Sequence, residues 1–150
     1  MLVLEDLITI NASPEKVYSF FEDPEKTYLS WHKDHVKFKW IQGNRMSTGA
    51  VGYFEEYLHG KLHRLKVHYS NVIPNRLIEF KPLPRFWRIF YPKSTLEFIS
   101  TNNDCVFKAL TYFRIGWISS NSKRAKEHIS LIQQHMKEEG ENLKFIIESE

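Results

Sequence analysis

A histidine and a glutamate lie four residues apart in the amphipathic segment near the end of the chain, "EHISLIQQHMKEEGENLKFII". A helical period places His135 and Glu139 one turn apart, in the apolar stripe with Met136 and Leu143, while Glu138 falls on the solvated side. Imidazole nitrogens and carboxylate oxygens are both ligands of zinc. A single His-x-x-x-Glu pair is more commonly an ordinary side-chain pair, so its chemistry depends on what else faces the same interior.

A second carboxylate is predicted to face inward from a β-hairpin. If "HG" at 59–60 is the turn, the flanking strands pair so that Glu56 faces His63 on the apolar side of the sheet. Glu55 and Arg64 then share the other side, where we expect an ion pair in solvent. Glu56 is therefore either a metal ligand or one half of a cross-strand pair with His63.

Two more histidines occur in "SWHKDHVKF", where a short helix is predicted to end and a strand to begin. Two carboxylates cannot both stay ionised in an apolar interior without compensation, because desolvation costs several kcal/mol per ion. A divalent cation would neutralise them. The residues therefore predict a metal site built from the helix pair, a hairpin glutamate (Glu56 or Glu55) and one histidine (His35 or His32). Zinc suits this set, and manganese or iron accepts similar ligands.

The elements that would position these residues follow a simple order. "LEDLITI" alternates like a strand, Ser13 and Pro14 begin a short helix, and a second short helix ends near Trp31. Strand-like runs separated by turn signals continue to residue 116, and residues 120–148 form one long amphipathic helix. We predict an α+β fold in which a curved antiparallel sheet of about six or seven strands wraps around the long C-terminal helix.

The segments "INASPEKVYSFFEDPEKTYLSWH" and "YFEEYLHGKLHRLKVHYSNVIPNRLIEF", followed by the long helix, resemble the START-like, helix-grip superfamily (SRPBCC). That superfamily includes polyketide cyclase-like proteins and the birch-pollen-allergen fold. The resemblance covers essentially the whole chain. It implies a deep apolar cavity between sheet and helix, which in that superfamily holds lipids, sterols, aromatic polyketides or plant hormones. A shared fold alone assigns no activity.

Within this superfamily, "TYLSWHKDHVKF", "YFEEYLHG" and "HMKEE" resemble the zinc-binding pattern of the diacetylphloroglucinol and phloretin hydrolase group. Those enzymes hold zinc with two histidines and two glutamates, including a His-x-x-x-Glu pair on the long helix. The resemblance implies that the ligands here are His35, Glu56, His135 and Glu139, with zinc as the cofactor.

Two functions of different classes follow from these observations. The first is a metal-dependent hydrolase or lyase for a hydrophobic phenolic or polyketide-like compound. The metal would polarise a ketone oxygen or activate water for a retro-Claisen cleavage. His63 is the candidate general acid or base, whereas Tyr53 is expected to face outward. The second is a non-catalytic carrier or sensor of an apolar small molecule or lipid. A partner-binding module would leave the inward polar residues without a role.

Composition limits the remaining classes. A chain of 150 residues, 42% of them hydrophobic, is expected to form one domain over residues 1–150. The net charge of +3 favours no nucleic acid partner, and we interpret "LPRFWRIFYPK" as a lid or rim of the cavity. No apolar run is long enough to span a membrane and no signal peptide is evident, so we expect no membrane partner. Cys105 is the only cysteine, which favours the reducing cytoplasm.

Overall fold

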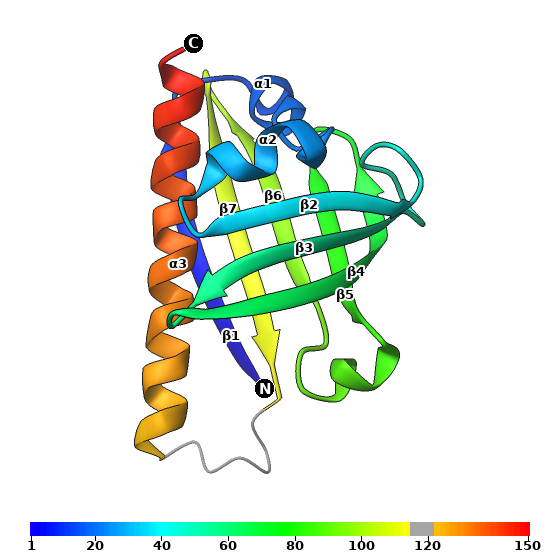
Figure 1. Ribbon diagram of the computed structural model, residues 1–150. Helices are drawn as coiled ribbons and strands as arrows, with labels where there is room; N and C mark the ends of the chain where they lie inside the picture. Colours follow the sequence, from blue (N-terminus) through cyan, green and yellow to red (C-terminus); the bar gives the residue numbers. More distant parts are fainter. Residues whose placement is uncertain (115–121) are drawn as a thin grey trace.

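Seven antiparallel strands form one curved sheet in the structure, a computed structural model that describes residues 1–114 and 122–150. Their order across the sheet is β1-β7-β6-β5-β4-β3-β2. The curvature carries β2 and β3 across β6 and β7, so that the sheet folds around an interior (Figure 1). The strands are β1 (Leu2–Ile10), β2 (His35–Gln42), β3 (Val51–Leu58), β4 (Lys61–Ile73), β5 (Leu77–Leu83), β6 (Ser94–Thr101) and β7 (Asp104–Phe113). The predicted fold class is confirmed.

Two short helices connect β1 to β2, as predicted. In α1 (Pro14–Ser19), the side chain of Ser13 accepts a hydrogen bond from the N–H of Lys16, the third helical residue. In α2 (Pro24–Trp31), the carboxylate of Asp23 accepts one from the N–H of Glu25, the second helical residue. Each helix has proline at its first position, where the missing N–H has no helical partner to lose. A short 3-10 helix, η1 (Arg85–Ile89), connects β5 to β6.

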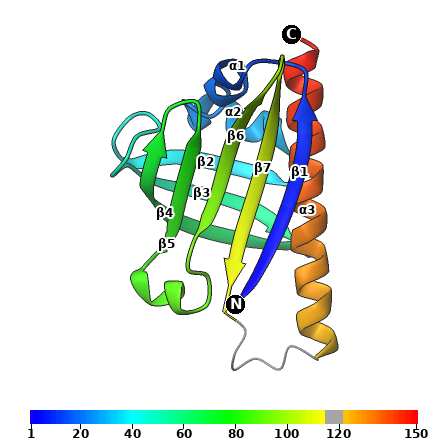
Figure 2. The same ribbon diagram turned by 180° about the vertical axis from the view of Figure 1, so that it is seen from behind.

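The long helix α3 (Lys123–Glu148) runs along the sheet beside β1 (Figures 1 and 2). Ser122 caps it by accepting from the N–H of Ala125. Its buried side includes His135, as the apolar stripe predicted. No helix in the described residues is both long and apolar enough to cross a membrane. The predicted strand residues 115 and 116 and helix residues 120 and 121 lie outside the described residues.

The β3–β4 hairpin has the predicted register. Glu56 pairs with His63 and Glu55 with Arg64. His59 and Gly60 have φ values of 57° and 73°, so both turn residues adopt the left-handed conformation typical of a two-residue hairpin turn. Glu55 lies 3.9 Å from the Arg64 guanidinium, on the side of the sheet that faces away from the interior.

The interior holds a packed core and an apolar cavity. The core centres on fully buried side chains such as Phe107, Ile10 and Leu143. Beside it lies a cavity of about 580 Å³ with mainly aromatic and aliphatic walls. Its lining includes Phe38, Phe54, Val67, Tyr69, Phe80 and Leu96. A volume of this size matches the usual range for small-molecule pockets.

Candidate functional site

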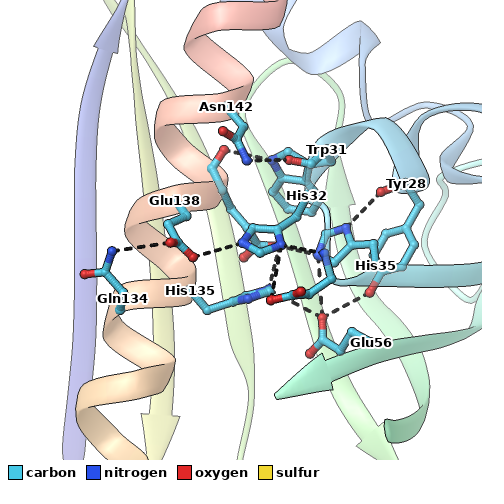
Figure 3. Close-up of polar contacts among 11 residues, drawn as sticks. Tyr28, Trp31, His32, His35, Glu56, Gln134, His135, Glu138 and Asn142 are labelled. Atoms are coloured by element: carbon cyan, nitrogen blue, oxygen red, sulfur yellow. Dashed lines mark hydrogen bonds and ion pairs between the residues drawn. The ribbon is translucent and has the colours of Figure 1, made fainter. Parts of the chain in front are cut away.

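The structure brings together all four residues predicted as metal ligands. His35 begins β2, Glu56 lies in β3, and His135 and Glu139 lie one turn apart on α3 (Figure 3). A carboxylate oxygen of Glu139 lies 3.0 Å from Nε2 of His35 and 3.5 Å from Nε2 of His135. A carboxylate oxygen of Glu56 lies 3.6 Å from each of the same two nitrogens. Residues up to 104 positions apart in the chain thus meet at one point.

These side chains are buried, and two of their polar atoms are unsatisfied. The His35 side chain is 0% exposed and the other three are 10 to 17% exposed. Although Nε2 of His35 and Nε2 of His135 lie at ion-pair distance from carboxylates, neither has a partner in hydrogen-bond geometry. Buried polar atoms of folded proteins are usually hydrogen-bonded. The exception here is a pair of imidazole nitrogens that face the same two carboxylates.

The hydrogen bonding of His35 decides which of its nitrogens carries the proton. Its Nδ1 lies 2.8 Å from the backbone carbonyl of Tyr28. A carbonyl oxygen only accepts, so Nδ1 must be the donor and a neutral ring has its lone pair on Nε2. That nitrogen is the one that faces Glu139 and Glu56. A backbone carbonyl in this position is the usual way in which proteins orient a metal-ligating histidine.

His32 has the opposite arrangement. Its Nδ1 accepts a hydrogen bond of 2.9 Å from the N–H of Asp34, so the proton of a neutral ring lies on Nε2. Nε2 then donates to Glu138 at 3.1 Å. His32, His135 and Glu138 are close enough to form a second possible metal group, but both nitrogens of His32 are already engaged, Nδ1 with the N–H of Asp34 and Nε2 with Glu138. The structure therefore favours His35 over His32 as the ligand. Glu138, expected in solvent, is 38% exposed and bonded to this buried ring.

A β-bulge turns His35 toward the cluster. Lys37 pairs with Glu55, and His35 pairs with Glu56, so one extra residue, Val36, lies between the two pairs. Regular alternation from Lys37 would place His35 on the outer side of the sheet. The bulge shifts it by one position to the inner side, where Glu56 lies. Bulges commonly redirect a side chain next to a functional site.

Tyr28 is a member of the site that our sequence analysis missed. Its ring stacks on the His35 ring at 3.9 Å and 4°, and its O–H donates to Glu56 at 3.1 Å. Burial and the neighbouring carboxylates raise the pKa of Tyr28 far above its usual value, so the phenol stays protonated. The signal available in the sequence was its position on α2, the helix that directly precedes the two histidines.

Two hydrogen bonds hold α2 against α3 beside the cluster. The indole N–H of Trp31 donates to the carbonyl of Glu139 at 3.0 Å. Asn142 donates to the carbonyl of Trp31 at 3.1 Å. Because His35 follows α2 directly, these contacts set the distance between the ligand residues on β2 and those on α3.

The electrostatics favour a charged cluster. Burial by itself lowers the pKa of His135, but contacts with the carboxylates of Glu139 and Glu56 outweigh it and raise the pKa to about 10. For Glu139, burial acts to raise the pKa, and the imidazoles of His135 and His35 reverse this and lower it. In the absence of a metal, a proton on His135 therefore helps to compensate the carboxylates.

The distances in the cluster also suit a metal ion. His35, His135 and Glu139 each offer an atom within 4.8 Å of the others, and Glu56, which is outside that compact group, is 3.6 Å from both imidazoles. Ligand atoms about 2.0 to 2.1 Å from a tetrahedral zinc ion lie about 3.3 Å apart. The four His–Glu distances run from 3.0 to 3.6 Å. His35, His135 and Glu139 fit a zinc ion in type and distance, and Glu56 adds a second carboxylate beside both imidazoles, which suits the charge of the ion. Their role as ligands stays a prediction.

The cluster forms part of the cavity wall. Glu56, His135 and Glu139 line the cavity, whereas His35 lies behind them. His63, the predicted general acid or base, also lines the cavity, on β4 opposite Glu56. Cys105 is outside this lining, and burial raises the pKa of its thiol to about 11, so it is not a nucleophile near neutral pH.

The comparisons with known proteins support the fold alone. No family model and no curated protein sequence match this chain. Among solved structures, the Zhui aromatase/cyclase from Streptomyces sp. R1128 is 13% identical, with a TM-score of 0.73 over 98% of this chain and 93% of that one. A polyketide-cyclase-like protein from Corynebacterium glutamicum is 16% identical, with a TM-score of 0.62 over 97% and 91%. Ara h 8.0201 is 10% identical, with a TM-score of 0.71 over 99% of both chains.

Proposed function

We propose that this protein is a metal-dependent hydrolase or lyase that acts on a hydrophobic phenolic or polyketide-like compound within its cavity. The observation that carries the proposal is the convergence of two imidazole nitrogens and two carboxylates at one wall of an apolar cavity, which three of the four residues line. Two buried imidazole nitrogens without a partner in hydrogen-bond geometry support this proposal, because buried polar atoms are usually hydrogen-bonded.

Zinc is the proposed cofactor, held by His35, His135, Glu139 and Glu56. When bound, it would supply Lewis acidity toward a ketone oxygen and would lower the pKa of a water molecule. The ligand set is neutral overall with Zn²⁺, because the two carboxylates balance the two charges of the ion. Manganese and iron accept the same ligand types.

The remaining chemistry falls to the chain itself. In a retro-Claisen cleavage, water adds to the carbonyl carbon, the adjacent C–C bond breaks, and the leaving carbanion takes up a proton to give an acid and a C–H product. His63 is the proposed residue for that proton transfer, because it lines the cavity on the strand next to Glu56. Aromatic walls such as Phe54 and Phe80 would hold a planar substrate and exclude bulk water.

The structural neighbours support the coarser part of this proposal. Two of them are described as an aromatase/cyclase and as polyketide-cyclase-like. A hydrophobic small molecule is thus the expected ligand whether or not a metal is bound. The second candidate function is accordingly a non-catalytic carrier or sensor, favoured by the presence of a sizeable apolar cavity.

Metal content separates these two functions. Protein purified without chelators should contain close to one zinc per chain by elemental analysis, and His135→Ala should lose it. His128→Ala is the matched control, since it removes a half-buried histidine two turns away on the same helix. Wild-type protein without metal would favour the carrier. If zinc is present, a screen for acyl-phenol cleavage with wild type and His63→Gln follows.

A further inference from the structure

An aromatic segment is exposed at the end of the molecule opposite α1 and α2. The segment from Pro84 to Tyr91 contains η1 and projects beyond the sheet (Figures 1 and 2). Four of its large apolar side chains are exposed, namely Phe86 at 56%, Trp87 at 44%, Ile89 at 57% and Tyr91 at 37%. The rings of Phe86 and Trp87 lie 4.9 Å apart, so they form one patch. Clustered exposed hydrophobic residues of this kind commonly mark an interaction surface.

Basic residues flank this patch in the sequence, although one of them, Lys93, pairs with Glu79 at 3.3 Å. Residues 80–96 contain two lysines and two arginines and no acid. Arg114 is next to the patch, because its N–H donates to the carbonyl of Phe90 at 2.8 Å. Across the described ranges 1–114 and 122–150, no carboxylate pairs with Arg85, Arg88 or Arg114 at salt-bridge distance.

The first turn of α3 adds to the same end of the molecule, as both ribbon views show. It carries three exposed basic residues, Lys123, Arg124 and Lys126, against one exposed acid, Glu127. This end of the molecule therefore carries more exposed basic than acidic residues on α3, in addition to the arginines beside the exposed aromatic side chains.

We infer that this end of the protein docks on the surface of an anionic lipid bilayer, with Phe86, Trp87 and Ile89 inserted at the level of the headgroups. Aromatic side chains favour the membrane interface, and clustered Arg and Lys residues are attracted to anionic headgroups. Surface docking needs no spanning helix, so the inference agrees with the finding that no helix of residues 1–114 and 122–150 could cross a membrane. It replaces our expectation of no membrane partner.

The position of the cavity gives this docking a consequence. Trp87 and Tyr91 line the cavity as well as being exposed at the surface. A docked protein would therefore have its cavity next to the bilayer, where apolar small molecules accumulate. The docking does not depend on the metal site. A protein without zinc could still dock on a bilayer, and a protein that does not dock could still bind zinc.

Vesicle flotation tests the docking. We expect the full chain to float with vesicles of phosphatidylcholine containing about 30% phosphatidylserine, at least tenfold more strongly than with phosphatidylcholine alone, and to be released by high salt. Equal binding to both vesicles, or no binding to either, would overturn the inference. So would binding to a single-stranded oligonucleotide without binding to vesicles.

Two sets of variants test the residues. Phe86→Ser with Ile89→Ser removes two exposed apolar side chains that do not line the cavity, and should weaken vesicle binding at least tenfold. Arg85→Glu should weaken it about fivefold or more. Leu29→Ser with Phe145→Ser is the matched control, since these side chains are 57% and 73% exposed elsewhere and should leave binding unchanged.

Circular dichroism and binding of an apolar fluorescent dye should be the same for all these variants. Retained vesicle binding by the Phe86/Ile89 double variant would overturn the inference. A wild-type dimer in sedimentation that this variant dissociates, without any vesicle binding, would show instead that the patch joins two copies of the chain.

Discussion

His35 and Glu56 face each other across β2 and β3 because Val36 forms a bulge between them. This relationship, rather than strand alternation, directs His35 to the interior. The carbonyl of Tyr28 then orients the ring so that a lone pair on Nε2 faces the carboxylates. Backbone irregularity and one hydrogen bond thus make this histidine available as a ligand.

The opposed hydrogen bonding of the two neighbouring histidines leads to the first prediction. His35→Ala should reduce zinc content below about a tenth of the wild-type value, because a ligand is lost. His32→Ala should keep near-stoichiometric zinc, although losing the buried bond to Glu138 should destabilise the fold by about 1 to 3 kcal/mol. Elemental analysis and urea unfolding measure the two effects. Loss of zinc only in the His32 variant would reverse our assignment.

Tyr28→Phe should weaken zinc binding about tenfold. The substitution removes the O–H that orients Glu56 but keeps the ring stacked on His35, and partners of metal ligands commonly contribute this much to affinity. Competition with a chromophoric chelator gives the affinity. Tyr53→Phe is the control, because it removes a phenol bonded to the outward Glu55. Equal affinities of these two variants would contradict a role for Tyr28.

Zinc binding should release protons at pH 7. The carboxylates of Glu139 and Glu56 raise the pKa of His135 to about 10 in the metal-free protein, so this ring is protonated and must lose its proton to become a ligand. Calorimetric titration in buffers of different ionisation enthalpy should give about one proton released per zinc. An enthalpy that does not depend on the buffer would show that His135 is already neutral.

The metal-free protein should lose stability as the pH rises. The pKa of His135 is higher in the folded state, about 10, than its unfolded value of 6.5. Its contribution is therefore complete below pH 6.5 and is lost between pH 6.5 and 10. Glu139 has the opposite sign: its folded pKa is lowered, so its contribution is lost as the pH falls below 4.5.

Urea unfolding of metal-free wild type and His135→Asn at pH 6 and pH 9 measures this linkage. The stability advantage of the wild type should shrink by about 1 to 3 kcal/mol between the two pH values. An advantage that is constant or grows toward pH 9 would be inconsistent with the raised pKa.

Gly52→Ala should destabilise the protein by about 1 to 3 kcal/mol through overpacking. A Cβ at this position in β3 would lie 2.8 Å from the Phe38 ring and 3.2 Å from the Tyr69 ring, and both rings pack in the core. Phe38→Leu should destabilise the wild type but recover part of the loss in the Gly52→Ala background. Additive losses in thermal unfolding would show that no clash exists.

Local patterns predicted most of the architecture. The cap Ser13, the hairpin turn at 59–60 and the alternation of β3 and β4 all depend on residues close in the chain, and the structure has each where the pattern indicated. The inward direction of Glu56 and His135 followed from the same periodicities, because a helix stripe and a strand face are local properties.

The choice between His32 and His35 could not be made in this way. It depends on the bulge at Val36 and on whether each Nδ1 meets a carbonyl or an N–H. The roles of Tyr28 and of the bond from His32 to Glu138 depend likewise on how α2 packs against α3.

The amino-acid sequence by itself therefore determined the order of elements, the strand register of the hairpin and the inward direction of Glu56, His135 and Glu139, since short-range periodicity and capping control these. Only the tertiary structure decided which inward side chains meet, which nitrogen of each histidine is available and how aromatic and basic residues gather at one end. These features depend on contacts between segments that are far apart in the chain, and no local pattern encodes their distances.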